Sequence, residues 1–204
     1  LCRDHEGNER PHPDGHHQSC VHEAGNTGDQ CDHGKPIGKR LGRIETRLKT
    51  FEKITLASLK SQTDQNFIFL VVSSDKMPES YKVRLKFLCD THPNVILRFV
   101  SPMHIVDAQN IIFKELDINQ EDCVQFRLDD DDGLSKRFIE KLRDHGQSLW
   151  MKYPKFSISF PNLLYSVVDG DTKGIYRWFS PFLGIGLSVR NNKRSVYGYA
   201  HYRI

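Results

Sequence analysis

The stretch NFIFLVVSSDKMP, residues 66–78, indicates the fold most clearly. Its first seven residues form a continuous apolar run rich in Phe and Val, and the polar residues Ser73, Ser74 and Asp75 follow. A continuous rather than alternating apolar run is typical of a strand buried on both faces, as in a parallel sheet. Pro78 then favours a helix start, because proline fits the first helical position. The stretch therefore predicts a buried strand, a polar loop and a helix.

Strands and helices alternate on both sides of this stretch. Before it, Ile44, Leu48, Phe51, Thr55 and Leu59 recur at helical spacing, with Lys and Arg on the other face, and predict an amphipathic helix. After it, the apolar runs predict a strand at 95–100, a helix at 106–116, a strand at 123–128 and a helix after residue 133. This order predicts an α/β fold: a Rossmann-like, mostly parallel sheet with helices on both faces. Such sheets bind ligands at the carboxyl ends of their strands.

The C-terminal part changes to strand-like runs, at residues 156–160, 163–168, 175–179 and 184–189. The sequence Asp169-Gly170-Asp171 separates two of these runs, and Asp-Gly between apolar runs is a hairpin signal. We therefore expect a mixed or antiparallel part after the parallel part.

Residues 1–40 differ in composition from the rest of the chain. They are rich in His, Gly, Asp and Asn and poor in large apolar side chains, so little buried surface offsets the entropy of ordering them. Their histidines and cysteines match no paired Cys-x-x-Cys or His-x-x-x-His zinc module. We expect a poorly ordered N-terminal segment over residues 1–40 and one domain over residues 41–204.

Overall charge and cysteine content narrow the class of protein. The formal net charge of +3 is too small to indicate a nucleic-acid partner. No apolar stretch approaches the roughly 20 residues of a spanning helix, and the N-terminus has no secretory signal pattern. Five cysteines without tight spacing predict no disulfide framework and fit a reducing compartment. These features favour a cytoplasmic protein without a transmembrane segment.

Four consecutive carboxylates, at residues 129–132, follow one predicted strand and precede a helix. In an extended backbone the Cα atoms of Asp129 and Asp131 lie about 7 Å apart on one side, so the carboxylates repel each other unless a cation balances them. Mg²⁺ and Mn²⁺ accept carboxylate oxygens together with substrate phosphates. Alternatively, Asp131 or Asp132 caps a helix beginning near Leu134. Four aspartates exceed what capping requires, so we favour a metal site.

Arg127 belongs to the strand before this acidic run. Strand alternation places its side chain with Cys123 and Gln125, opposite to Phe126 and Leu128. A charged group in a covered sheet needs a carboxylate or phosphate partner, and the alternative is an arginine that reaches solvent at the strand end. Both interpretations stay open at this point.

Two blocks of the sequence, LASLKSQTDQNFIFLVVSSDKMP at 56–78 and FRLDDDDGLSKRFIEKLR at 126–143, resemble one known family. The chain is similar, over about residues 44–204, to proteins described as rhamnosyltransferases, which are related to nucleotide-sugar glycosyltransferases of the GT-A fold. The resemblance implies a GT-A-like fold. It also implies transfer of a sugar, such as rhamnose, from a nucleotide-diphosphate donor to a hydroxyl group of a glycan or other acceptor.

The resemblance also implies functional positions. Asp129-Asp130-Asp131 matches the Asp-x-Asp motif that binds the sugar nucleotide and a divalent cation, Mn²⁺ or Mg²⁺. The implied metal ligands are Asp129, Asp131, Asp132 and a late histidine, His201. The implied substrate-binding residues are Ser73, Ser74, Asp75, Arg127, Asp129 and Asp130.

Two parts of the family pattern find no match in this sequence. Family members begin with an apolar strand, which the polar sequence before Ile44 does not offer, so the domain is expected to be incomplete. The general base of sugar transfer cannot be placed either, since Asp169 and Asp171 favour a turn. Two alternatives therefore remain: a non-catalytic or truncated relative, and another metal-dependent phosphoryl-transfer enzyme.

Overall fold

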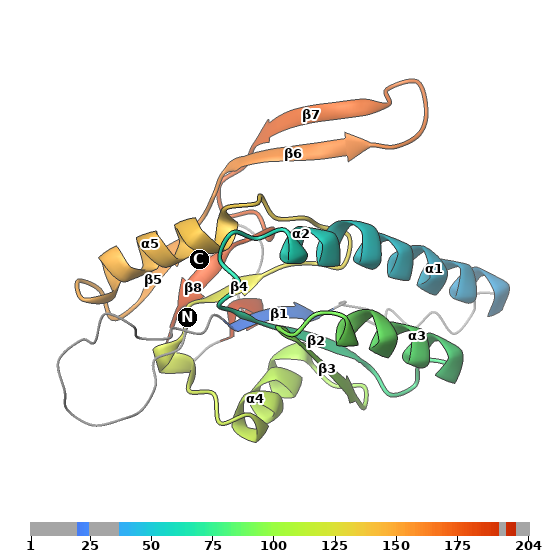
Figure 1. Cartoon of the computed structure of the whole chain (residues 1–204), viewed down its shortest axis with the longest axis horizontal. Helices are drawn as coiled ribbons and strands as arrows, with labels where there is room; N and C mark the ends of the chain where they lie inside the picture. The colour runs from blue at the N-terminus through green and yellow to red at the C-terminus, as the bar shows by residue number, and fades with distance from the viewer. Residues whose placement is uncertain (1–19, 25–36, 192–194, 199–204) are drawn as a thin grey trace.

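The computed structural model describes the backbone of residues 20–24, 37–191 and 195–198, and the side chains of this set from residue 41 onward. Its main sheet has the strand order β3-β2-β1-β4-β8-β5 (Figure 1). The parallel strands are β1 (Cys20–Ala24), β2 (Ile68–Ser74), β3 (Val95–Val100) and β4 (Gln125–Arg127). β8 (Ser188–Arg190) pairs antiparallel with both β4 and β5 (Phe156–Ile158). The predicted α/β fold with a mixed C-terminal part is confirmed.

One long helical segment crosses the sheet and consists of three consecutive parts. These are α1 (Ile37–Thr50), the π-helical η1 (Phe51–Leu56) and α2 (Ala57–Lys60). Leu48, Phe51, Thr55 and Leu59 are all buried, as their helical spacing predicted. The π-helical part brings the buried hydroxyl of Thr55 to the loop after β4, where it lies 2.9 Å from the carbonyl oxygen of Asp132.

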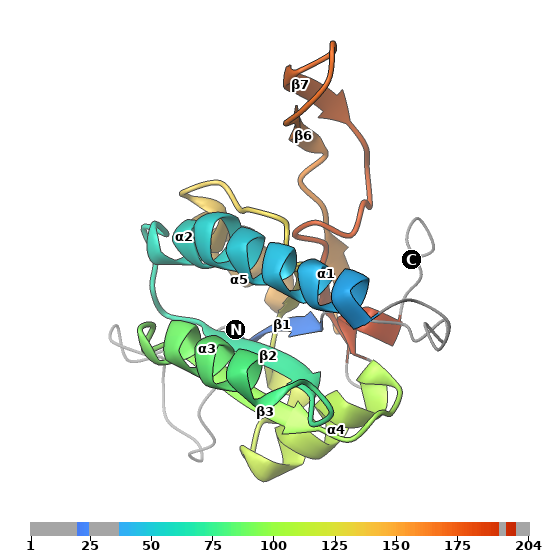
Figure 2. The same cartoon turned by 90° about the vertical axis from the view of Figure 1, so that its right-hand side faces the viewer.

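Helices cover both faces of the sheet (Figure 2). β2 shows why, because its alternate residues enter two different cores. Phe69 and Val71 pack with the helices on one side, whereas Leu70 and Val72 pack against α4 on the other. The remaining helices are α3 (Glu79–Asp90), α4 (Ile105–Glu115), α5 (Phe138–Trp150) and the short 3₁₀ turns η2 (Gln120–Asp122) and η3 (Val196–Gly198). No helix of the described residues is long and apolar enough to cross a membrane.

Two expectations about the N-terminal part and the cysteines need correction. The first strand of the sheet, which the sequence seemed to lack, is β1, and it lies between β2 and β4 within the segment assigned to a polar tail. Five parallel backbone pairs hold it to β2, so backbone bonding compensates for its polar sequence. Cys123 is disulfide-bonded, contrary to the expectation of no disulfide, while the buried Cys89 is not part of a disulfide.

A second, two-stranded sheet projects from the body of the molecule (Figures 1 and 2). It is an antiparallel hairpin of β6 (Asn162–Val167) and β7 (Gly174–Phe179), as the Asp-Gly signal predicted. Gly170 has φ of +87° in the connecting turn, and its amide donates to Asp169 Oδ1 at 2.8 Å. Asp169 and Asp171 therefore belong to the tip of the hairpin, away from the body.

Candidate functional site at the carboxyl edge of the sheet

The four aspartates form a turn directly after β4, at the carboxyl edge of the parallel strands. The amide of Asp132 donates to the carbonyl oxygen of Asp129 at 3.2 Å and closes the turn. Asp131 is exposed, and its three neighbours are partly buried. α5 begins only at Phe138, with Arg137 at the N-cap. The alternative in which Asp131 or Asp132 caps that helix is therefore wrong.

The π-helical segment η1 fixes this acidic turn from one side. The hydroxyl of Thr55, a fully buried residue, lies 2.9 Å from the carbonyl oxygen of Asp132 and 3.4 Å from that of Asp129. Gly133 follows the turn and packs so closely on the helix that a Cβ atom there would lie 3.3 Å from Ile54 Cγ2. One hydroxyl thus holds both ends of the turn.

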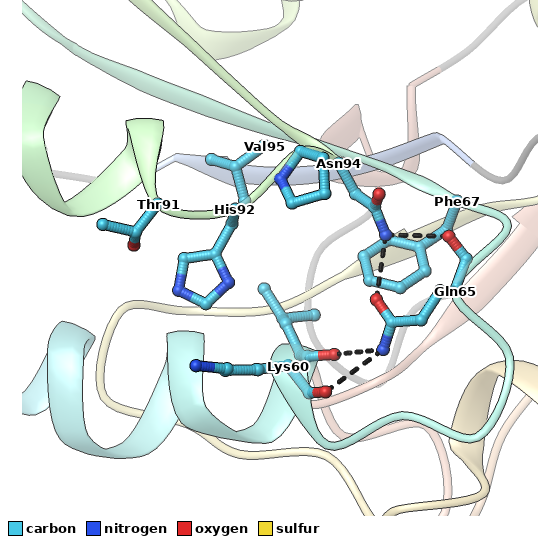
Figure 3. A pocket seen from close by; sticks show the side chains of 9 residues that line it. Lys60, Gln65, Phe67, Thr91, His92, Asn94 and Val95 are labelled. Carbon is cyan, nitrogen blue, oxygen red and sulfur yellow. Dashed lines mark hydrogen bonds between the residues drawn. The ribbon is translucent and has the colours of Figure 1, made fainter.

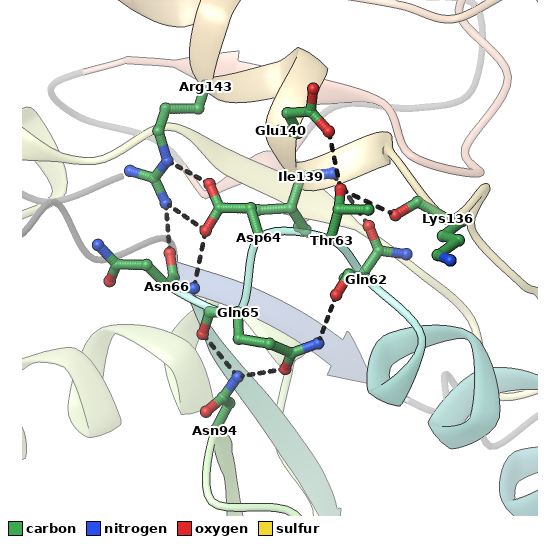
Figure 4. A network of polar contacts seen from close by, with 10 residues as sticks. All are labelled: Gln62, Thr63, Asp64, Gln65, Asn66, Asn94, Lys136, Ile139, Glu140 and Arg143. Carbon is green, nitrogen blue, oxygen red and sulfur yellow. Dashed lines mark hydrogen bonds and ion pairs between the residues drawn. The ribbon is translucent and has the colours of Figure 1, made fainter.

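Gln62 continues this connection beyond the turn (Figure 4). Its amide nitrogen donates to the carbonyl oxygens of Ser58 and Ser135 at 3.0 and 2.9 Å. Its Oε1 accepts from the amide of Ile139, in the first turn of α5, at 3.1 Å. Since α5 has no side-chain cap of its own, Gln62 caps it from a distant part of the chain.

Thr63 and Asp64 extend the network to the outer side of α5 (Figure 4). Thr63 donates through its amide to Lys136 O at 2.9 Å and through its hydroxyl to Glu140 Oε2 at 2.8 Å. Arg137 and Thr63 together lower the pKa of Glu140 to about 2. Arg143 pairs with Asp64 at 2.5 Å. The two sequence blocks that carried the family resemblance are therefore in direct contact.

Asp130 is engaged by an arginine that the sequence analysis missed. The guanidinium group of Arg47, in α1, binds both carboxylate oxygens of Asp130, and the two side chains are 28% and 17% exposed. The helical pattern had placed the basic residues of this helix on its solvent face. Because the partners are 83 residues apart, only the packing of α1 over the turn could show the pair. Both carboxylate oxygens of Asp130 are therefore bound by an arginine, whereas Asp129, Asp131 and Asp132 are not bound by Arg47.

Arg127 is almost covered, with only 12% of its side chain exposed. Its Nε lies 3.6 Å from Asp129 Oδ1, and its Cζ lies 5.0 Å from the ring centroid of Tyr197. The hydroxyl of Tyr197 donates to Leu128 O at 3.1 Å, which keeps the ring in place. The interpretation of Arg127 as a solvent-reaching arginine is wrong. Its Nε is buried without a hydrogen-bond partner among the described residues. A positively charged donor with an unused hydrogen bond therefore lies beside the turn.

Among the four aspartates of the turn, Asp132 has a clearly raised pKa. Burial, followed by the charges of Asp129 and Asp131, raises the pKa of Asp132 to about 7, although Arg127 acts in the opposite direction. Burial and the neighbouring carboxylates both disfavour the ionised form of Asp132. The four carboxylates also outnumber the two arginines that pair with the turn among the described residues, Arg47 and Arg127, so negative charge is in excess there.

Ser73, Ser74 and Asp75 lie at the same carboxyl edge, after β2. Only β1 separates β2 from β4, so the two groups are about 10 Å apart across the sheet. Asp75 accepts from Ser101 Oγ at 2.8 Å through Oδ2, whereas its buried Oδ1 has no hydrogen-bond partner within the described set. The structure thus brings two of the implied site groups to one edge.

The other implied site positions stand as follows. His201 lies outside the described residues. Within residues 20–24, 37–191 and 195–198, no three His, Cys, Asp or Glu side chains already converge in a metal-holding arrangement. A small pocket beside Lys60, His92 and Asn94 lies at the opposite, amino edge of β2 and β3 (Figure 3), where burial lowers the pKa of His92. That pocket is separate from the carboxylates.

No curated protein matches the chain. Among solved structures, the chain is similar to S. aureus TarS, residues 1–349, with a TM-score of 0.39 and 15% sequence identity. That match covers 77% of this chain and 37% of the TarS chain, so this chain spans well under half of the length of that solved chain. The family model described as "Putative rhamnosyl transferase" matches residues 40–204, and the chain belongs to that family of glycosyltransferases.

Proposed function

We propose that this chain binds a nucleotide-diphosphate sugar, with a divalent cation, at the acidic turn, and that it transfers the sugar to a hydroxyl acceptor. The four aspartates in one turn at the carboxyl edge of the sheet carry the proposal, because ligands of such sheets bind at that edge and the chain belongs to a family of glycosyltransferases. Among the described residues, Arg47 and Arg127 pair with this turn, which leaves an excess of negative charge. A bound cation would remove that excess. Rhamnose is the proposed sugar, after the description of the family.

The oxygen ligands of the turn fit a hard cation, and Asp129, Asp131 and Asp132 would hold it. Asp130 has a different role in this proposal, since its carboxylate orients the turn through Arg47. When bound, Mn²⁺ or Mg²⁺ supplies positive charge that stabilises the leaving diphosphate. His201 stays a proposed fourth ligand from the family resemblance.

In this proposal, different neighbouring residues bind different parts of the nucleotide-sugar donor. Arg127 holds its Nε 3.6 Å from Asp129 Oδ1, and its guanidinium group would attract the diphosphate oxygens. Ser73, Ser74 and Asp75 would contact the nucleoside, one strand away. Oδ1 of Asp75 lies 3.9 Å from Lys76 Nζ but has no hydrogen-bond partner among the described residues, so it is a suitable acceptor for a ribose hydroxyl or a base N–H group.

Thermal unfolding in the presence of nucleotides tests the proposal. UDP, GDP and dTDP are each added with Mn²⁺, with Mg²⁺, and with a metal chelator. We expect at least one nucleotide to raise the melting temperature only when a cation is present, because a ligand that binds the native state alone stabilises it. Asp131→Ala should abolish that shift.

The matched control is Asp144→Ala, which removes an equally exposed carboxylate from α5, away from the turn. Asp144→Ala should keep the full metal-dependent shift. If no nucleotide stabilises the wild-type chain, or if Asp131→Ala responds like wild type, the proposal is wrong. Hydrolysis of dTDP-rhamnose compared with other nucleotide sugars then tests the proposed donor.

A further inference from the structure

The two arginines that touch the acidic turn are held in different ways. Arg47 donates to both carboxylate oxygens of Asp130, so these donors are already used. The buried Nε of Arg127 has no hydrogen-bond partner among the described residues, and Asp129 Oδ1 lies 3.6 Å from it, beyond hydrogen-bond distance. The ring of Tyr197 lies 5.0 Å from Arg127 Cζ. An aromatic ring attracts a guanidinium group and uses none of its N–H donors, so Arg127 is held with a donor still available.

Tyr197 is itself fixed through its side chain and its backbone. Its hydroxyl donates to Leu128 O at 3.1 Å, and this carbonyl group directly precedes the acidic turn. Its amide donates to Ser195 Oγ, also at 3.1 Å. The ring therefore cannot leave Arg127 without breaking a hydrogen bond to β4 or to its own turn.

A buried polar network anchors η3, the 3₁₀ turn that carries Tyr197. Ser195 is fully buried, and its hydroxyl donates to Oε1 of Gln109, a fully buried residue of α4. The amide of Val196 donates to Oε1 of the buried Gln125, in β4, at 3.1 Å. Apolar packing alone tolerates several arrangements, whereas a satisfied buried polar network specifies one. The network thus fixes where the next residue, Tyr197, stands.

Filling of the core is the simplest alternative role for Tyr197. Its neighbour Val196 already has this role, because it is fully buried and apolar. Tyr197 is only partly buried, and its ring faces a charged group instead of the core. The contacts of Tyr197 therefore favour a role at the acidic turn over a role in packing.

We propose that Tyr197 is a positioning residue of the donor site, which holds the guanidinium group of Arg127 where it binds the second phosphate of a nucleoside diphosphate. This proposal rests on the proposed donor site. A cation on the acidic turn and a guanidinium group beside it make two adjacent positive centres, and these fit two phosphates better than one. Preference for a nucleoside diphosphate over a monophosphate should therefore depend on Tyr197.

Nuclear magnetic resonance of the arginine Nε–Hε groups tests the hold on Arg127 without any ligand. Arg127→Lys identifies the signal of Arg127 by its loss. In wild type this signal should be shifted by the Tyr197 ring and should show a nuclear Overhauser effect to the ring protons. Tyr197→Leu should lose the shift, whereas Tyr197→Phe, which keeps the ring, should retain it. No Overhauser effect in wild type, or an unchanged signal in Tyr197→Leu, overturns the proposal.

Calorimetric titration with Mn²⁺ present tests the preference between nucleotides. The pairs are UDP and UMP, GDP and GMP, and dTDP and dTMP. Tyr197→Leu should weaken binding of the preferred diphosphate about tenfold and change binding of its monophosphate little, because the lost contact belongs to the second phosphate. The matched control is Tyr153→Leu, which removes a 52% exposed tyrosine after α5 and should keep the wild-type preference.

The outcomes separate this proposal from the donor site on which it rests. Equal weakening of diphosphate and monophosphate in Tyr197→Leu would make Tyr197 a structural residue and overturn the proposal, as would an unchanged preference. If wild type binds no nucleotide, the donor site fails and the nucleotide preference fails with it. The resonance spectra still decide in that case whether Tyr197 holds Arg127.

Discussion

The acidic turn and the hairpin are both connections at the edge of a sheet, yet the protein holds them in opposite ways. Buried hydrogen bonds from Thr55 and Gln62 fix the turn and the loop that follows it. The hairpin is bonded within itself and at its base, and its large apolar side chains are exposed. A turn held by buried hydrogen bonds suits a small ligand that needs preorganised groups. The hairpin lacks such a connection to the body beyond its base among the described residues.

The largest effect should come from breaking the network that fixes the turn. Gln62→Leu leaves the amide of Ile139 and the carbonyl oxygens of Ser58 and Ser135 without this partner, and each such buried group costs about 1–3 kcal/mol. We expect a loss of about 4 kcal/mol in the free energy of unfolding, measured with urea. Gln147→Leu, at an exposed site on α5, should change it little. Equal stability of the two variants would contradict the stabilising role of Gln62.

A glycine-to-alanine substitution beside the acidic turn, at Gly186, and one at the hairpin tip, at Gly170, compare the packing of the two regions; the amide of Gly186 donates to Arg127 O, just before the turn. Gly186 has φ of +66°, and a Cβ atom there would lie 2.7 Å from Phe138 Cε2. Gly170 has φ of +87° with open space around it. Gly186→Ala should therefore cost about 3 kcal/mol from strain and overlap, against about 1 kcal/mol from strain alone in Gly170→Ala. Calorimetric melting temperatures measure the difference, and equal losses would mean that the loop at Gly186 is as yielding as the hairpin tip.

Removing the hydroxyl of Thr55 tests how far the bond to the turn contributes to stability and to Mn²⁺ binding. Thr55→Val keeps the shape but deletes the bond to Asp132 O, so stability should fall by about 1 kcal/mol. A turn held less firmly should also bind Mn²⁺ about tenfold more weakly in a titration, while Thr55→Ser restores binding. Thr46→Val, on the exposed side of α1, is the control. Unchanged Mn²⁺ affinity in Thr55→Val would show that Thr55 supports the fold alone.

The stability of the protein should also depend on pH through Asp132. Because the pKa of Asp132 is raised to about 7 in the folded chain, the unfolded chain releases this proton more readily at about pH 4 to 7. This group therefore destabilises the fold progressively as pH rises through that window. Asp132→Asn should melt like wild type near pH 4 and at a higher temperature than wild type near pH 8. If the melting temperatures of Asp132→Asn and wild type differ by the same amount at every pH in this window, the raised pKa of Asp132 is contradicted.

Much of the fold follows from local patterns in the sequence. The continuous apolar run before Ser73 predicted a strand buried on both faces, and β2 indeed packs into two cores. Helical spacing from Ile44 to Leu59 predicted the long helix and its buried side. These elements were predictable because each buries its own periodic set of apolar side chains.

Interactions between distant residues could not be predicted in this way. β1 has a polar sequence and depends on neighbouring backbones, so no hydrophobic run marks it. Gln62 looked like a polar loop residue, and only the position of α5 makes it a cap. The helical pattern likewise assigned Arg47 to the solvent face, and only the structure shows that it pairs with Asp130 of the acidic turn. Sequence patterns located the carboxylates but not the groups that hold them.

Binding of Mn²⁺ tests the central claim most directly, that the acidic turn is a cation site. Electron paramagnetic resonance counts the Mn²⁺ that remains free as protein is added at about pH 8, above the pKa of Asp132. We predict binding by wild type and by Asp144→Asn, and its loss in Asp131→Asn. Binding by Asp131→Asn that equals wild type, or no binding by any of the three, would contradict the account.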